Sequence, residues 1–231
     1  MPQHQLNIAR LHGAPEVVAG VEKLLDDYHQ EGEYAMLPGR TMLPVVRGTL
    51  VVRTSQQIQK LNEAKGELYT EPVDKAGTIP FALFSNAQRL ETYGGAASGI
   101  EHVATFLAGC LNLPTRVETI RLDLVEMVHA MRNELDRFRL VGATITNYAH
   151  NSYVIGRYAA KFADTEQGLK LLSEHADEVA SISVKFGGGD DKVTARVSPN
   201  ATIQYTCGDD ARFEAARLLR ATALAATTAK T

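Results

Sequence analysis

The chain has 231 residues, of which 45% are hydrophobic and 22% charged, so it is long enough for a sizeable core and has an ordinary globular composition. Its net charge of −3 gives no global attraction to nucleic acid or to an anionic membrane. No run approaches the ~20 apolar residues of a membrane helix, and the first residues lack the apolar core of a signal peptide. We therefore expect a cytoplasmic protein with no membrane partner.

Neither a metal nor a cofactor is predicted. The two cysteines, Cys110 and Cys207, lie far apart in the chain and fall at positions expected to face a core, so we expect two buried free thiols. Two cysteines do not make a structural zinc site, and the histidines are scattered without a His-x-x-x-His spacing.

The first half, residues 1–114, predicts an α/β arrangement. An apolar stripe that contains Val17, Val21 and Leu24 indicates a helix over residues 15–29. Ser55 has the chemistry of an N-cap and Gly66 that of a C′ residue, which predicts a second helix between them. The other elements expected here are a loose arm over residues 1–13, strands within 33–54, 67–71 and 79–84, a turn over 72–77, and a short helix before Gly94.

Gly94, Gly95 and Ser98 form a candidate anion-binding loop ahead of a helix over residues 98–111. Free N–H groups at the N-terminus of a helix can hold an anion. The loop lacks the Lys-Ser/Thr pair of a phosphate loop, and its glycine spacing does not match a dinucleotide fingerprint. The favoured interpretation is therefore a turn followed by a capping box, in which Ser98 and Glu101 take part.

The second half, residues 115–231, has the clearest pattern. Asp123 and Asp164 each precede an amphipathic helix and are expected to cap it. Alternating residues predict strands before, between and after these helices, which gives the order β-α-β-β-α-β over residues 119–186.

This order is the split βαβ plan of ferredoxin-like folds, with two helices on one face of a four-stranded antiparallel sheet. A hairpin over residues 192–206 and a helix over residues 211–225, capped by Asp209 or Asp210, extend it. The fold class predicted is α+β. The two halves are two domains or one continuous domain.

No complete catalytic set is present, and the protein is interpreted as non-enzymatic. The run His150-Asn151-Ser152 has no orienting acid, and a hairpin turn explains it. Asp190 and Asp191 together with the Gly94–Gly99 loop leave a metal-dependent phosphoester hydrolase as an alternative, but Gly-Asp-Asp is also ordinary turn chemistry.

Two basic segments are candidates for binding single-stranded RNA or DNA. Arg157, Tyr158 and Lys161 lie on the third predicted strand of the ferredoxin-like unit, where RNA-recognition domains carry aromatic residues that stack on bases. The favoured alternative is that Tyr158 and Phe162 are core residues. Arg212, Arg217 and Arg220 give the last helix a basic flank, for which solvation is the simpler explanation.

The leading functional hypothesis is a binding or assembly protein that acts through a protein surface, in a homo-oligomer or a larger complex. The absence of a catalytic set and a long sheet whose hairpin edges need cover both favour this hypothesis. A nucleic-acid-binding subunit is the first alternative and the phosphoester hydrolase is the second.

Overall fold

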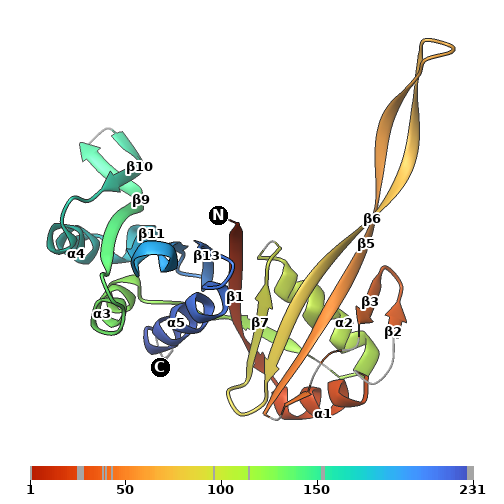
Figure 1. The fold of residues 1–231 in the computed structure, drawn as a ribbon, viewed down its shortest axis with the longest axis horizontal. Helices are drawn as coiled ribbons and strands as arrows, with labels where there is room; N and C mark the ends of the chain where they lie inside the picture. Colours follow the sequence, from red (N-terminus) through yellow and green to blue (C-terminus); the bar gives the residue numbers. More distant parts are fainter. Residues whose placement is uncertain are drawn as a thin grey trace. The chain divides into compact units, whose positions relative to one another are not determined.

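The computed structural model describes residues 2–24, 29–37, 39, 41–42, 44–95, 97–113, 115–151 and 154–227. The chain forms two compact units. The C-terminal unit comprises residues 1–9 and 119–231, and the N-terminal unit comprises residues 10–118. Strand β1 (Gln3–His12) contributes its first residues to one unit and its last residues to the other. Figure 1 gives the element labels.

The C-terminal unit is a sheet with the strand order β10-β9-β11-β12-β13-β1, and each pair of neighbours in it is antiparallel. Its helices are α3 (Leu124–Glu134), α4 (Thr165–Glu174) and α5 (Arg212–Ala225). Its strands besides β1 are β9 (Arg139–Asn151), β10 (Val154–Lys161), β11 (Val179–Phe186), β12 (Val193–Val197) and β13 (Thr202–Thr206).

Alternation along the strands decides which face of this sheet holds the core. On β11, Ile182, Val184 and Phe186 are buried, and they share a face with Leu140 of β9. A Cβ built on Gly168 of α4 would lie 2.7 Å from Leu140 Cδ2, so α4 packs directly on this face. The three helices lie together on one side of the sheet (Figure 1). The other face carries the alternate, mostly polar residues.

The α+β class is confirmed, but the predicted ferredoxin-like unit is wrong. A ferredoxin-like sheet places the first strand of the unit between the third and the fourth, whereas β9 lies between β10 and β11 here. Residues 119–122 supply no such central strand. β8 (Arg116–Thr119) pairs with β1, and Leu122 makes only an isolated bridge with Thr227.

The N-terminal unit packs two helices on an antiparallel sheet. α1 (Ala14–Leu24) and α2 (Gly99–Leu111) touch each other so closely that a Cβ on Gly20 would meet Leu111 Cδ2 at 2.6 Å. The strand order is β1-β7-β6-β5-β3-β2, with β4 beside β5 and β8 beside β1. The remaining bounds are β2 (His29–Glu31), β3 (Tyr34–Leu37), β4 (Thr41–Met42), β5 (Val45–Asn62), β6 (Glu67–Phe84) and β7 (Arg89–Tyr93).

Four predictions are wrong for a common reason, namely that long-range pairing overrides local signals. Residues 55–66 are not a helix, because Ser55–Asn62 pairs residue by residue with β6. Residues 72–77 are not a turn, because they pair with residues 52–57 as part of β6. Among the described strands, none pairs with the other side of β6 at Pro72 or Pro80, so proline is tolerated at both sites. The expected loose arm over residues 1–13 is the strand β1, and the short helix expected before Gly94 is the strand β7.

Several predictions are confirmed. The helices expected around α1, α2, α3, α4 and α5 are present, as is the β12–β13 hairpin. Cys207 is buried, as predicted, whereas Cys110 is only half-buried. None of the helices in the described part of the chain is long and apolar enough to cross a lipid bilayer.

Candidate functional site

The side chains of the first predicted nucleic-acid-binding segment, Arg157, Tyr158 and Lys161, lie on opposite faces of the sheet. Tyr158 is opposite Ile145 on the helix side, and its ring stacks on Tyr148 at a centroid distance of 4.8 Å. Lys161 is opposite Gly142 and points to the other face, where Arg157 also falls by alternation. Tyr158 is 43% exposed, and Phe162 is half-buried. The basic and aromatic side chains therefore do not form one stacking platform.

The second predicted segment, on α5, belongs to the helix side of the sheet. Arg217 is held by Glu214, with Nε 2.8 Å from Oε2. Arg212 is an exposed neighbour of the buried Tyr205, and Arg220 is half-buried. These arginines therefore have contacts within their own unit.

The candidate anion-binding loop connects β7 to α2. Gly94 and Gly95 both have positive φ, at 85° and 73°, which suits glycine. Ser98 precedes α2 but makes no side-chain capping bond, so the predicted capping box is wrong. The loop thus follows the strand β7, and its two glycines have the backbone geometry of a turn.

No metal site is found among those candidate catalytic residues that the structure describes. Asp191 lies in a short 3₁₀ turn, Gly189–Asp191, after β11, and Ser152 falls outside the described residues. Within the described ranges, no three or more His, Cys, Asp or Glu side chains are grouped to hold a metal ion.

A cavity of about 660 Å³ lies in the C-terminal unit where the end of α3, the β11–β12 connection and the start of α5 meet. Its charged lining is mostly acidic, with Arg137 as the basic member. The acidic lining residues are Glu134, Asp136, Asp191, Asp210 and Glu214.

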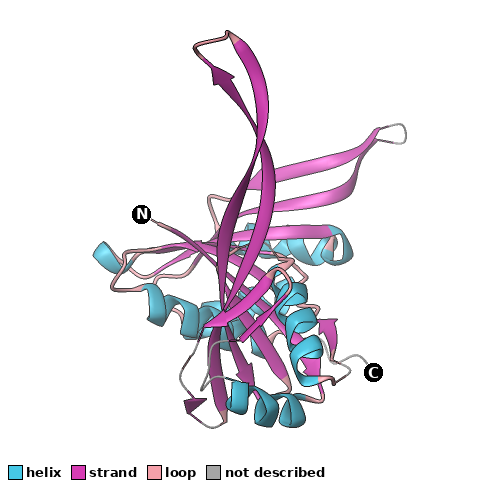
Figure 2. Ribbon diagram, turned by 90° about the vertical axis from the view of Figure 1, so that its right-hand side faces the viewer, coloured by secondary structure: helices cyan, strands magenta, loops and turns pink. Residues whose placement is uncertain are grey.

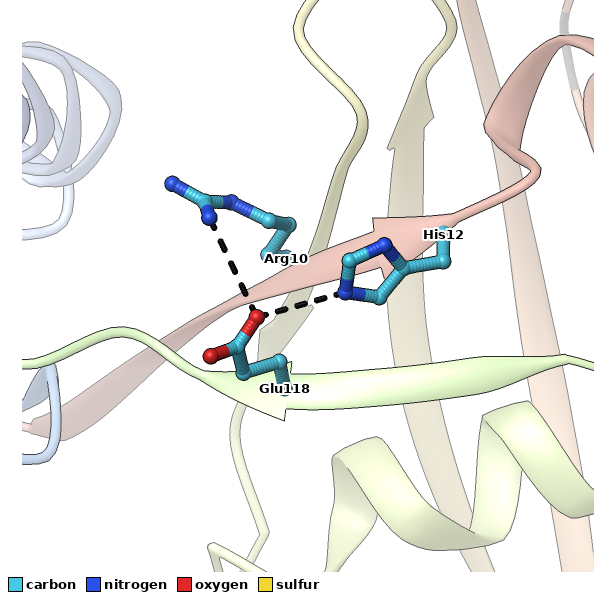
Figure 3. A network of polar contacts seen from close by, with 3 residues as sticks. All are labelled: Arg10, His12 and Glu118. Atoms are coloured by element: carbon cyan, nitrogen blue, oxygen red, sulfur yellow. Dashed lines mark hydrogen bonds and ion pairs between the residues drawn. The ribbon is translucent and has the colours of Figure 1, made fainter. Parts of the chain in front are cut away.

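A polar network links β1 to β8 in the N-terminal unit (Figure 3). Glu118 Oε2 lies 3.2 Å from His12 Nε2 and 3.9 Å from Arg10 Nη1. These side chains are 29–46% exposed, so solvent screens both pairs. The network is best explained as a surface link between neighbouring strands.

A buried ion pair lies on β7. Glu91 is fully buried, with Arg89 Nε 2.8 Å from its Oε1, and the Tyr93 hydroxyl donates to its Oε2 at 2.6 Å. The Arg89 guanidinium lies 4.0 Å from the centroid of the Phe84 ring. Loss of either charge would leave the other buried without its partner, so the role of this group is structural.

The most unusual feature of the N-terminal unit is the ribbon formed by β5 and β6, which stands out from the rest of the unit (Figures 1 and 2). The two strands pair without interruption from Val45↔Phe84 to Asn62↔Glu67. β3 pairs with β5 only as far as Val52, and β7 pairs with β6 only over Phe81–Phe84. We call residues 53–77 the arm. No third strand of the described residues pairs with the arm, although at its base Arg53 N donates to Glu33 O at 2.8 Å.

The arm ends in a hydrogen-bonded turn. Gly66, with φ of 66°, donates its N–H to Asn62 O at 2.7 Å, and the Asn62 side chain accepts from Ala64 N. At about 3.4 Å per residue, the nine residues Thr54–Asn62 extend about 30 Å. Lys60 and Glu71 bridge the two strands at 2.6 Å.

Apolar side chains are exposed at the tip of the arm. Leu61 and Leu68 are direct cross-strand partners and are 58% and 68% exposed, and the neighbouring Tyr69 is 46% exposed. The charges on the arm balance. Its basic residues are Arg53, Lys60, Lys65 and Lys75, and its acidic residues are Glu63, Glu67, Glu71 and Asp74.

Sequence reasoning did not identify this feature, because Ser55 and Gly66 suggested a helix. A signal for the strand was available in the alternation of Ile58 with Gln57 and Gln59 and in the β-branched run before Ser55. No family model matches the chain, and no similar curated protein was found. The function is therefore inferred from the chain's own geometry.

Proposed function

We propose that the protein is a non-enzymatic assembly protein whose arm binds a second copy of the same chain. The observation that supports this proposal is the uncovered arm itself. A two-stranded ribbon is marginally stable alone in water, and this one exposes an apolar tip and two strand edges that no other described strand pairs with. A partner surface that covered the tip would bury these apolar side chains and so stabilise the arm.

The balanced charge of the arm favours a second copy as the occupant. A nucleic acid would be attracted by a basic arm, whereas this arm has as many acidic as basic residues. A neutral surface meets its own copy without like-charge repulsion, and most soluble oligomers are built from identical chains. Burial of Leu61 and Leu68 would contribute about 1.5–3 kcal/mol each.

An arm-shortened variant tests the proposal. Val52 and Gly77 are opposite each other, so replacing residues 53–76 by Asn-Gly closes the ribbon with a two-residue hairpin turn. The removed residues are exposed or half-buried, so the fold is expected to persist by circular dichroism. Sedimentation equilibrium is expected to show an oligomer for the intact chain and a monomer for the variant.

A point variant tests the tip alone. Leu61→Ser with Leu68→Ser is expected to raise the dissociation constant about 100-fold, since 1.4 kcal/mol corresponds to a factor of ten. The matched control is Gln59→Ser with Thr70→Ser, which changes the adjacent cross-strand pair on the same face. An intact chain that stays monomeric at high concentration, or equal weakening by both variants, would contradict the proposal.

A further inference from the structure

The strands of the C-terminal unit contain no aspartate or glutamate. Their permanently charged side chains are all basic, namely Arg139, Arg157, Lys161, Lys185 and Arg196. The acidic residues of the same unit lie in its helices and turns, as Glu134 and Asp191 do at the cavity. In this unit the strands therefore carry only positive charge, and the negative charge lies in the helices and turns.

Because of the strand register, most of these basic side chains lie on the face of the sheet opposite α3, α4 and α5. We call this face the open face. Two rows of side chains cross the sheet there, perpendicular to the strands, and neither row contains an aromatic or a large aliphatic residue. The first row is Lys161, Gly142, Ser183, Arg196, Gln204 and Gln5. The second row is Arg139, Lys185, Thr194, Thr206 and Gln3.

The cations on the open face are poorly compensated. Arg139 and Lys185 are direct cross-strand partners, an arrangement of like charges that destabilises a sheet. Among the described residues, neither they nor Lys161 and Arg196 have an acidic side chain within ion-pair distance. A bound anion would remove this repulsion.

Part of the open face is preorganised. Arg196 donates from Nε to Ser181 Oγ at 3.1 Å, which fixes the direction of its guanidinium group. A shallow groove of about 220 Å³ lies beside it, lined by Gln3, Ser183, Thr194, Arg196, Gln204 and Thr206 among others. Hydroxyl and amide side chains of this kind, together with Arg and Lys, contact phosphate and sugar oxygens in nucleic-acid complexes.

We propose that the open face binds the sugar-phosphate backbone of double-stranded nucleic acid, independently of base sequence. Strands lie about 4.8 Å apart and alternate residues about 6.8 Å apart, so the rows form a regular array of donors. Single-stranded nucleic acid is disfavoured because its binding sites use aromatic side chains as stacking platforms, and the two rows have none. This binding is separate from the assembly through the arm.

Two other anionic partners fit the same face less well. A membrane-binding surface combines basic residues with apolar side chains that enter the lipid, and the rows offer no large apolar group. A protein partner would be expected to meet an aromatic or aliphatic anchor at the centre of the interface. The chemistry of the rows therefore favours phosphate contacts alone.

Fluorescence anisotropy with a 20-base-pair DNA duplex tests this proposal on the full chain. If the cations of Arg139, Lys161, Lys185 and Arg196 each neutralise a phosphate, log K is expected to fall with log [salt] at a slope of about −3.6. Affinity should then decrease about 100-fold between 50 and 200 mM NaCl. The absence of binding at 50 mM NaCl would overturn the proposal.

A charge-matched pair of variants locates the site. Lys185→Gln with Arg196→Gln is expected to flatten the slope to about −1.8 and to weaken binding at least about tenfold at 100 mM NaCl. The control is Lys170→Gln with Arg217→Gln, which removes the same charges from exposed positions on α4 and α5. Equal weakening by both variants would overturn the assignment. Should the first variant fail to fold, Arg139→Gln with Lys161→Gln is measured in its place.

Two competitor arms identify the ligand class. The single strand of the same length should bind more weakly than the duplex. Vesicles of phosphatidylserine and phosphatidylcholine should not compete with the duplex for the protein. Tighter binding of the single strand, or vesicle binding that exceeds duplex binding, would overturn the proposal in favour of another anion.

Discussion

His4 links the stability of the C-terminal unit to pH through a single side chain. It is opposite Tyr205 in the β1–β13 pair, with ring centroids 5.3 Å apart, and its buried Nε2 has no hydrogen-bond partner among the residues that the structure describes. Burial lowers the pKa of His4 below 6.5, and the positive charge of Arg212 lowers it further, while Asp209 opposes this shift. The folded chain thus prefers the neutral imidazole.

The sign of the pH dependence follows from this lowered pKa. Between the folded pKa and 6.5 the unfolded chain binds more protons, so the free energy of unfolding is expected to fall as pH decreases below about 6.5. Thermal unfolding between pH 7.5 and 5.5 should show a smaller decrease in Tm for His4→Asn than for the native chain. His129→Asn, an exposed change on α3, is the control. An unchanged pH dependence in His4→Asn would refute this role.

At the scale of elements, α3 and α5 differ in how they begin. The Asp123 carboxylate accepts from Val125 N and Glu126 N at 2.9 and 3.1 Å, whereas α5 begins after Ala211 without a side-chain cap. Asp123→Ala is therefore expected to lower the free energy of unfolding by about 1 kcal/mol in urea titration. Asp210→Ala, the same substitution beside α5, should change it by less than about 0.5 kcal/mol. Equal losses would contradict the capping assignment.

The elements that sequence predicts well are those whose signals are local. Asp123 and Asp164 cap the helices that follow them, since an N-cap bond joins residues two or three positions apart. The same reasoning failed at Asp209 and Asp210, because α5 starts without a side-chain cap. For these helices, local signals therefore predict the position better than they predict the capping contact.

The elements that sequence misses depend on pairing between distant segments. β1 was expected to be a loose arm, yet it pairs with β13, nearly 200 residues away, and its alternation of Leu6 and Ile8 was the only local sign. Ser55, Gly66 and Pro72 are residues common at the ends of elements, so local signals predict a helix, a strand and a turn where the chain forms the arm. The open face also has no local signal, since Arg139, Lys185 and Arg196 meet only through strand register.

For the whole molecule, the two proposals together predict multivalent binding. An assembly joined by the arms would carry one open face per copy, so a second face would bind a long duplex at a high effective concentration. The intact chain should therefore bind a 60-base-pair duplex more tightly than a 15-base-pair duplex. The ratio of the two affinities should exceed the ratio of the numbers of binding positions on the two duplexes. The arm-shortened variant should show only that statistical ratio.

Comparison on the short duplex separates this linkage from damage to the binding face. The arm carries balanced charge and none of the residues of the two rows, so both proteins should bind 15 base pairs with the same affinity and the same salt slope. Anisotropy titrations of both duplexes at 150 mM NaCl measure the two effects separately. If the shortened variant keeps the full preference for the long duplex, the faces are not linked through the arm, because linkage requires the copies to remain joined.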